Sequence, residues 1–240
     1  MKLAVMQPYF FPYLGYWQLI RSVDRFVVFD DVAYIKRGWV NRNRLLIQGA
    51  PHYFTAPVRD ASQNRRICDT RLAADDDWRG TLVRTVETAY RRAPHFDRVF
   101  PVVEALIRHD TDDLAAYLAH QLQTLAVFMR IETPFASSRA YDNAGLAGQA
   151  RILDLCAREA ADHYHNLPGG MALYDAAAFE RAGIALRFVA MRPQPYPQRS
   201  PGFVPGLSIV DALMELGPDG IQPYLDACDV HAATPQAASA

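Results

Sequence analysis

The first 31 residues, MKLAVMQPYFFPYLGYWQLIRSVDRFVVFDD, contain the order of elements that decides the fold. Residues 2–6 form a short apolar run, and Pro8 removes the backbone donor that a longer strand would need. Residues 13–22 then place apolar side chains at helical spacing, and residues 26–29 form a second run of β-branched and aromatic side chains. Because both predicted strands are apolar throughout, the order strand, loop, helix, strand favours parallel strands joined by a right-handed crossover.

Polar side chains follow both of these predicted strands. Gln7 comes directly after the first strand, and Asp30 and Asp31 come after the second. In open parallel sheets, the residues just beyond the carboxyl ends of the strands form the ligand site. We therefore expect Gln7 and the Asp30-Asp31 pair to lie at such a site.

The rest of the sequence predicts a hairpin, several helices and three further strands. The expected elements are an antiparallel hairpin of residues 45–47 and 52–58 with a tight turn at 49–51, three helices within residues 78–90 and 100–128, a short strand within 125–131, a helix through 152–156, strands at 163–166 and 184–189, and a helix over 208–216 with Ser208 as its N-cap. The fold class is thus α/β, a Rossmann-like, mostly parallel sheet with a helical middle segment.

The domain organisation follows from these elements. We expect a single α/β domain over residues 1–228, with a helical insertion at about residues 75–130. Residues 229–240 are small and polar, which predicts a flexible tail.

Composition and charge exclude several classes of protein. Of the 240 residues, 50% are hydrophobic and 21% are charged, which is typical of a globular protein and not of a disordered one. The 25 Lys and Arg side chains balance 26 Asp and Glu, so no overall basic excess attracts nucleic acid or anionic lipid. No apolar run approaches the roughly 18–20 residues of a membrane helix. The opening residues also reach Gln7-Pro8 too early for a signal peptide, so we expect a cytoplasmic protein.

The three cysteines give no sign of a cross-linked or metal-bound framework. Cys68, Cys156 and Cys228 are widely spaced and form no CxxC motif. We therefore expect three reduced thiols.

Residues 31–44, DVAYIKRGWVNRNR, are the densest concentration of chemically active side chains. Arginine and lysine bind phosphate or carboxylate, and aromatic faces stack on a base or a sugar ring. The alternative interpretation is a solvated basic loop whose Trp39 belongs to the core. On the functional interpretation, acid–base chemistry is assigned to Asp31, Tyr34 and Lys36, and substrate binding to Arg37, Trp39, Asn41 and Arg42.

A second candidate segment is the aromatic loop over residues 7–13, QPYFFPY. Its two prolines fix the backbone and hence the directions of the side chains between them. Phe10 and Phe11 are expected to anchor the loop in the core. Gln7, Tyr9 and Tyr13 are the candidates for substrate binding.

A third candidate segment is the glycine-containing stretch over residues 166–170, NLPGG. Glycine lets backbone N–H groups approach an oxyanion or a phosphate closely, so Asn166, Gly169 and Gly170 are candidates. A simple turn is the alternative, because neither a GK[ST] sequence nor GxGxxG is present. His163 and His165 could share one side of a strand, but no third ligand follows at a recognised spacing, so no metal site is predicted.

These motifs together resemble the WbqC-like family of bacterial proteins. The resemblance rests on residues 6–16, MQPYFFPYLGY, and on residues 31–44. Later matches are residues 166–170 with Leu173-Tyr174, and residues 203–205 with 207–214. The sequence departs from the family pattern at His165, where the family is more often apolar, and in the alanine-rich tail. The matches add Tyr174, Ser208 and Asp211 to the candidate substrate-binding residues.

The resemblance also implies a function. Members of the family look like products of O-antigen and other surface-polysaccharide clusters, for which transfer of glycine or a similar acyl group to an amino sugar is proposed. The implied activity is acylation of the amine of a nucleotide-linked amino sugar. Asp31 would accept the amine proton, residues 36–44 would bind the diphosphate, and Asn166 with the Gly169 and Gly170 amides would stabilise the developing oxyanion.

Two other functions stay open at this point. An aromatic and polar loop after the first strand also suits an ATP-dependent nucleotidyl-transfer or amino-acid-activating enzyme, although no HxGH-like pair of histidines follows. A non-catalytic protein that binds a glycan or a partner is the third interpretation. The sequence names no cofactor. It leaves the acyl donor open among coenzyme A, a carrier-protein thioester, an aminoacyl-tRNA and a free amino acid with ATP, and it leaves the acceptor sugar and the oligomeric state open.

Overall fold

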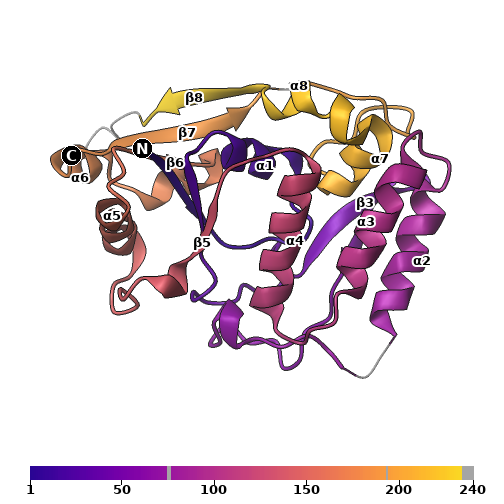
Figure 1. Cartoon of the computed structure of the whole chain (residues 1–240), viewed down its shortest axis with the longest axis horizontal. Helices are drawn as coiled ribbons and strands as arrows, with labels where there is room; N and C mark the ends of the chain where they lie inside the picture. Colours follow the sequence, from indigo (N-terminus) through magenta and orange to yellow (C-terminus); the bar gives the residue numbers. More distant parts are fainter. Residues whose placement is uncertain (75–76, 193, 234–240) are drawn as a thin grey trace.

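A computed structural model describes residues 1–74, 77–192 and 194–233 of the chain (Figure 1). Its centre is a six-stranded sheet with the strand order β5-β2-β1-β6-β7-β8. The strands are β1 (Lys2–Met6), β2 (Arg25–Val28), β5 (Phe135–Ser137), β6 (His163–Asn166), β7 (Ala185–Met191) and β8 (Cys228–Ala232). All neighbouring strands are parallel except β8, which is antiparallel to β7. The predicted Rossmann-like, mostly parallel sheet is confirmed.

The strand order reverses at β1. From β1 the chain continues to β2 and then β5 on one side, whereas β6 and β7 extend the sheet on the other side. In an open α/β sheet this reversal opens a crevice at the carboxyl ends of the two diverging strands. The crevice expected here lies beyond β1 and β6, where Gln7 and Asn166 are found.

The two faces of the sheet bury separate apolar clusters because side chains alternate along a strand. Ala4 of β1 faces a large cluster that includes residues of α1 (Leu14–Arg21), α4 (Leu114–Phe128) and α7 (Ile209–Gly220). Leu3 and Val5 face a smaller cluster with α5 (Gly148–Arg158) and α6 (Ala176–Arg181). Figure 1 shows α5 and α6 on one side of the molecule and the larger group of helices on the other.

The helical middle segment consists of α2 (Trp78–Tyr90), α3 (Phe96–Arg108) and α4, which confirms the three predicted helices. It packs next to a separate two-stranded sheet, the antiparallel hairpin of β3 (Arg42–Ile47) and β4 (Ala50–Thr55). Gln48 and Gly49 join these strands with φ angles of +52° and +78°. Two successive positive φ angles define a type I′ turn, whose twist matches that of paired strands. The tight turn therefore begins one position before the predicted one.

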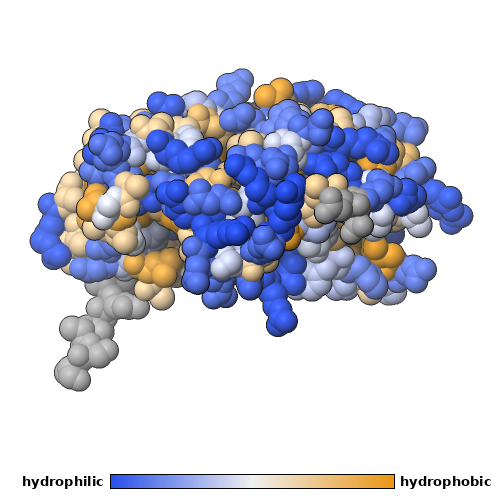
Figure 2. All heavy atoms as spheres, turned by 90° about the horizontal axis from the view of Figure 1, so that it is seen from below, coloured by the Kyte–Doolittle hydropathy of each residue, from blue (hydrophilic) through white to orange (hydrophobic). Residues whose placement is uncertain are grey.

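The remaining elements are short and connect the sheet to its surroundings. They are the 3₁₀ helices η1 (Ile67–Asp69), η2 (Ser138–Ala140) and η3 (Pro168–Leu173), and the helix α8 (Gln222–Leu225). Within the described ranges, no helix combines the length and the apolar character needed to cross a membrane. Figure 2 shows one face of the molecule, on which hydrophilic residues predominate and apolar residues occur in small groups.

Two predicted elements differ from the structure. The short strand predicted within residues 125–131 is wrong, because α4 continues to Phe128 and the strand β5 begins only after Pro134. Apolar residues at the end of an amphipathic helix look like a buried strand when they are considered alone. The tail predicted from residue 229 instead starts with β8, since residues 229–232 pair with the edge strand β7. Residues 234–240 lie outside the described residues.

Candidate functional site

A cleft of about 560 Å³ lies at the carboxyl ends of β1 and β6, where the strand order reverses. Pockets that bind small molecules have volumes of about 300–1,000 Å³, so this cleft can hold one. Eight of the residues predicted from the sequence line it: Gln7, Tyr9, Tyr13, Trp39, Asn166, Gly169, Gly170 and Tyr174. The tertiary structure thus brings the aromatic loop, two residues of the basic segment (residues 31–44) and the glycine-containing segment into one cavity.

The aromatic loop is held in place by hydrogen bonds to its backbone. The Asn43 amide donates to the carbonyl groups of Phe10 and Phe11 at 3.0 and 2.8 Å. The Ser208 hydroxyl donates to the Phe11 carbonyl at 2.8 Å, and Phe11 itself has a φ of +41°. Since phenylalanine rarely adopts this conformation, its surroundings must impose it. Ser208 therefore supports the loop from behind and does not line the cleft.

Tyr13 and Tyr9 present their rings to the cleft from this loop. A Cβ atom on Gly15 would lie 2.6 Å from the Tyr13 ring, so glycine is needed for the ring to fold back over the start of α1. Burial raises the pKa of both phenols, because the charged phenolate is poorly solvated there. Tyr9 and Tyr13 are therefore neutral near pH 7 and can donate hydrogen bonds to a ligand.

Asn166 orients a third phenol. Its Nδ2 donates to the Tyr174 hydroxyl at 3.0 Å and to the Tyr164 hydroxyl at 3.3 Å, while its Oδ1 accepts from the Leu167 N–H at 2.7 Å. A Cβ atom on Gly170 would lie 3.0 Å from Asn166 Nδ2, so the glycine makes room for this amide. Burial raises the pKa of Tyr174 more than the hydrogen bonds from Tyr164 and Asn166 lower it. The result is a protonated hydroxyl at the wall of the cleft.

The basic segment contributes less to the cleft than the sequence predicted. Trp39 is 38% exposed and lines the cleft, whereas Lys36 and Arg37 are exposed and do not line it. Arg42 donates to the carbonyl groups of Gly38, at 3.2 Å, and Arg37. Its guanidinium also lies 4.4 Å from the centre of the Tyr53 ring. Arg42 therefore stabilises the loop that precedes it in the chain, residues 37–41.

Tyr34 and Asn41 hold the same segment from inside. The Tyr34 hydroxyl donates to Asn41 Oδ1 at 2.7 Å, and Asn41 Nδ2 donates to the Ala56 carbonyl at 2.8 Å. Both side chains are buried and neither lines the cleft. They join the basic segment to the end of β4.

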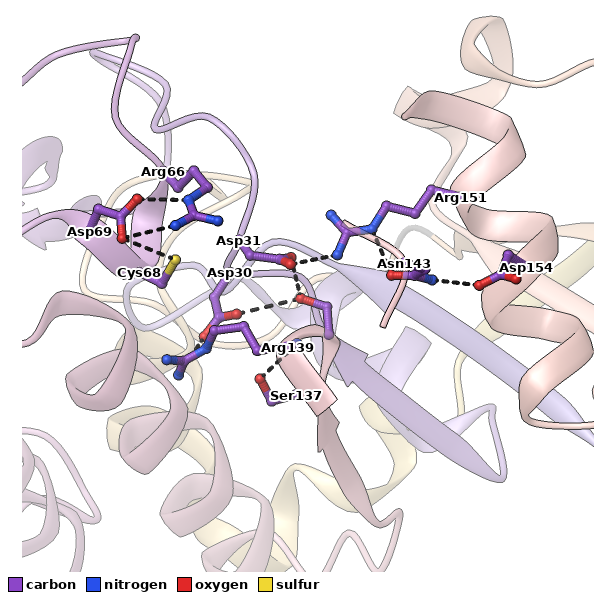
Figure 3. A network of polar contacts seen from close by, with 11 residues as sticks. Asp30, Asp31, Arg66, Cys68, Asp69, Ser137, Arg139, Asn143, Arg151 and Asp154 are labelled. Atoms are coloured by element: carbon purple, nitrogen blue, oxygen red, sulfur yellow. Dashed lines mark hydrogen bonds and ion pairs between the residues drawn. The ribbon is translucent and has the colours of Figure 1, made fainter. Parts of the chain in front are cut away.

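Asp31 is part of a buried polar network beside the cleft (Figure 3). It accepts from Arg151 Nη2 at 2.5 Å and from the Ser138 hydroxyl at 2.5 Å. Burial alone would raise its pKa, but the hydrogen bonds from Arg151 and Ser138 outweigh burial and hold the pKa below its usual value. The same network continues from Arg151 Nε to Asn143 Oδ1 at 3.0 Å. Asp31 therefore binds β2 to α5.

This placement changes the role that the sequence suggested for Asp31. Its carboxylate is committed to Arg151 and does not line this cleft. The neighbouring Asp30 points to Arg139, 3.1 Å away, as Figure 3 shows. The Asp31 network instead positions the start of α5, where Gly148 and Gln149 line the cleft.

Asp211 is also buried away from the cleft. It accepts from the Tyr90 hydroxyl at 2.9 Å, from the Tyr196 hydroxyl at 2.8 Å and from Gln198 Nε2 at 2.9 Å. Burial raises its pKa, although these three donors lower it in part. Asp211 thus joins α2, α7 and the chain around residues 196–198.

Sequence reasoning missed part of the cleft wall. Phe29, Ile35, Gln149 and Leu173 line the cleft, but none of them was a candidate, because a single apolar or amide side chain gives no chemical signal even within a motif. Ile35 and Leu173 are 48% and 69% exposed, which is unusual for such side chains and becomes visible only in the structure. Among the described residues, no group of three or more His, Cys, Asp or Glu is placed to hold a metal ion.

The fold and the site define a Rossmann-like α/β protein with a cleft of small-molecule size at the reversal of strand order. The model of the WbqC-like protein family matches residues 7–223, and the chain belongs to this family. It is also 28% identical over 229 residues to a Mycobacterium tuberculosis (strain H37Rv) protein, "Uncharacterized protein Rv1507c". That match covers 95% of this chain and 98% of the relative. No solved structure matches the chain.

Proposed function

We propose that the protein is a transferase of surface-polysaccharide biosynthesis that adds an acyl or aminoacyl group, such as glycyl, to the amine of a nucleotide-linked amino sugar. The observation that carries this proposal is the position of the Tyr174 hydroxyl, which Asn166 orients at 3.0 Å beside the Gly169-Gly170 turn. Acyl transfer needs donors at the oxygen that becomes negatively charged in the transition state. The neutral Tyr174 phenol, beside the turn whose glycines leave the backbone accessible, supplies such a donor.

The lining of the cleft suits a sugar. Trp39, Tyr9 and Tyr13 offer aromatic faces on which a sugar or base ring can pack, and Gln7 offers an amide. Among the described lining residues there is no carboxylate and no histidine. We therefore propose that the acceptor amine enters the cleft in its neutral form and that no side chain of the cleft acts as its base.

The transfer step balances for an activated donor, that is a thioester, an ester, or an acyl adenylate formed from an amino acid and ATP with release of pyrophosphate. The amine nitrogen forms a bond to the carbonyl carbon of the donor, and the bond from that carbon to the leaving sulfur or oxygen breaks. The proton that the amine loses ends on the leaving group. Tyr174 donates a hydrogen bond to the carbonyl oxygen while the negative charge develops there, and the pKa raised by burial keeps this phenol protonated.

The test is a transfer assay with mass detection of the acylated sugar. The purified protein is incubated with nucleotide-linked amino sugars and, in separate reactions, with acyl-coenzyme A, an acyl carrier-protein thioester, an aminoacyl-tRNA, or an amino acid with ATP and Mg²⁺. Tyr174→Phe should lower kcat by about 10²–10³-fold with little change in KM, because it removes one oxyanion donor. Tyr53→Phe is the matched control, since Tyr53 is 56% exposed and does not line the cleft.

Two results would contradict the proposal. One is a wild-type protein that transfers no acyl group from any of these donors. The other is a Tyr174→Phe variant with the kcat of the wild type. Release of pyrophosphate that depends on ATP and an amino acid, without any acylated sugar, would instead favour an amino-acid-activating enzyme.

A further inference from the structure

A second pocket of about 280 Å³ adjoins the cleft. Tyr9, Tyr13 and Trp39 line both cavities and form the wall between them. The smaller pocket is completed by Pro12, Asn43, Arg44 and Gly206. Among the described residues that line either cavity, Arg44 is the only one with a charged side chain.

The guanidinium of Arg44 is poorly compensated. Its Nη2 donates to the Gly206 carbonyl at 3.1 Å, and it lies 5.6 Å from the centre of the Trp39 ring. Its Nε is buried and, among the described residues, has no hydrogen-bond acceptor. No ion pair joins it to a carboxylate of the described chain, whereas Arg151 has Asp31 at 2.5 Å. A buried donor without a partner costs about 1–3 kcal/mol, so a native structure that keeps one has a reason to do so.

The other three cations of the basic segment do not share this position. Arg42 is two residues away on the same strand, yet it donates to the carbonyl groups of Gly38 and Arg37. Lys36 and Arg37 are exposed and do not line the smaller pocket. Only Arg44 therefore places a positive charge beside the aromatic wall of the cleft.

The hydrogen-bonding groups around Arg44 suit an anion. The Asn43 amide is already committed to the carbonyl groups of Phe10 and Phe11, which leaves the two phenols, the Trp39 indole N–H and the guanidinium as side-chain donors. A guanidinium binds the oxygens of a phosphoryl group through two parallel hydrogen bonds. The Gly206 carbonyl on Nη2 and the ring of Trp39 fix the direction in which this fork points.

We propose that the smaller pocket binds the phosphoryl groups of the substrate through Arg44, with the Tyr9 and Tyr13 hydroxyls as further donors. The sugar then lies across the aromatic wall, in the larger cleft beside Tyr174. This inference rests on the proposed function for the identity of the substrate, and it assigns the diphosphate to Arg44 in place of Arg42, Arg37 and Lys36.

The experiment measures binding of inorganic pyrophosphate to the whole protein by calorimetry and by tryptophan fluorescence. Arg44→Gln should weaken binding by about 10- to 100-fold, the value of one charge-assisted bidentate contact. Arg42→Gln is the matched control from the same strand and should bind as the wild type does. Arg44→Lys keeps the charge but loses the fork, so it should bind with intermediate affinity.

The fluorescence arm locates the bound anion. Trp39 lines the pocket, while the other two tryptophans, Trp17 and Trp78, are buried elsewhere in the core. The change in fluorescence on adding pyrophosphate should therefore disappear in Trp39→Phe. Thermal melting of each variant without ligand identifies any variant that does not fold. If Arg44→Gln does not fold, the comparison of Arg44→Lys with the wild type tests the role of Arg44 instead.

Several outcomes would overturn the inference. They are an absence of saturable pyrophosphate binding by the wild type, equal binding by Arg44→Gln and the wild type, and a larger loss in Arg42→Gln than in Arg44→Gln. Tighter binding of acetate than of pyrophosphate would also overturn it, because it would assign the pocket to a carboxylate. If the wild type transfers acyl groups but pyrophosphate binding does not depend on Arg44, only this inference is refuted and the proposed function stands. Arg44-dependent binding without any transfer refutes only the proposed function.

Discussion

Asp31 and Asp211 are both buried carboxylates, but the charges of their partners differ. Asp31 forms an ion pair with Arg151, whereas Asp211 accepts hydrogen bonds from two tyrosines and a glutamine, all of them neutral. As a result the pKa of Asp31 is lowered and that of Asp211 is raised. Burial by itself therefore does not decide the charge of a carboxyl group, because the balance between desolvation and its donors does.

The two carboxylates also stabilise different regions. Asp31 joins β2 to α5 beside the cleft, and Asp211 joins the helical segment to the chain near Tyr196. Each is a site candidate from the sequence, and neither lines the cleft in the structure. Three measurements separate their roles, and the expected effects differ in size.

Asp31→Asn should produce the largest loss of stability. It leaves the Arg151 guanidinium buried without its counter-charge, which typically costs about 3–5 kcal/mol. Urea unfolding of the variant and the wild type measures this loss. The double variant Asp31→Leu with Arg151→Met is the control and should be less destabilised than the single variant, since it leaves no buried charge unpaired. A loss below about 1 kcal/mol in Asp31→Asn would contradict the interpretation of a structural ion pair.

Asp211→Asn should cost much less, about 1 kcal/mol at pH 7. The amide oxygen of asparagine can still accept from Tyr196 and Gln198, which share one carboxylate oxygen in the wild type, while the Tyr90 hydroxyl must turn to accept from the new amide N–H. No partner is left with an unpaired charge. The same urea titration measures it beside Asp31→Asn. If Asp211→Asn were the more destabilising of the two, the contrast between charged and neutral partners would be refuted.

The pH dependence should have opposite signs at the two sites. The folded pKa of Asp31 is lowered, so its contribution is present above the unfolded pKa of about 3.9 and is lost as the pH falls through the folded value. The folded pKa of Asp211 is raised, so the folded state gains stability as the pH falls through that value toward about 3.9. Thermal melts between about pH 3 and 8 should show that Asp211→Asn flattens the profile above about pH 4. If the stability of Asp211→Asn depended on pH as that of the wild type does, the raised pKa of Asp211 would be contradicted.

Local patterns predicted most of the fold because helices and strands depend on neighbouring residues. The first strand, the hairpin, the three middle helices and the Ser208 cap of α7 follow from apolar spacing and capping preferences. The strand predicted at 125–131 failed for the same reason, since the end of an apolar helix carries no local mark that separates it from a strand.

The candidate site was predictable only where a motif also lies at a strand end. Gln7 follows β1 and Asn166 ends β6, and these strands are neighbours in the sheet, so both motifs meet in one cleft. The basic segment behaves differently because Tyr34, Asn41 and Arg42 turn back on their own loop. Arg42 and Tyr34 bind backbone or side-chain groups of that segment, and no sequence pattern distinguishes such contacts from ligand binding.

Residues close together in the chain set the helices and strands of the parallel α/β fold and the strand ends that hold the cleft, so the sequence alone was enough to predict them. Which polar groups face a ligand depends instead on the tertiary structure. Arg151 lies 120 residues from Asp31, and Asp211 lies 121 residues from Tyr90. Partners so far apart come together only through folding, and it is these partners that commit a carboxylate to the core or, among the described residues, leave Arg44 Nε without a hydrogen-bond acceptor.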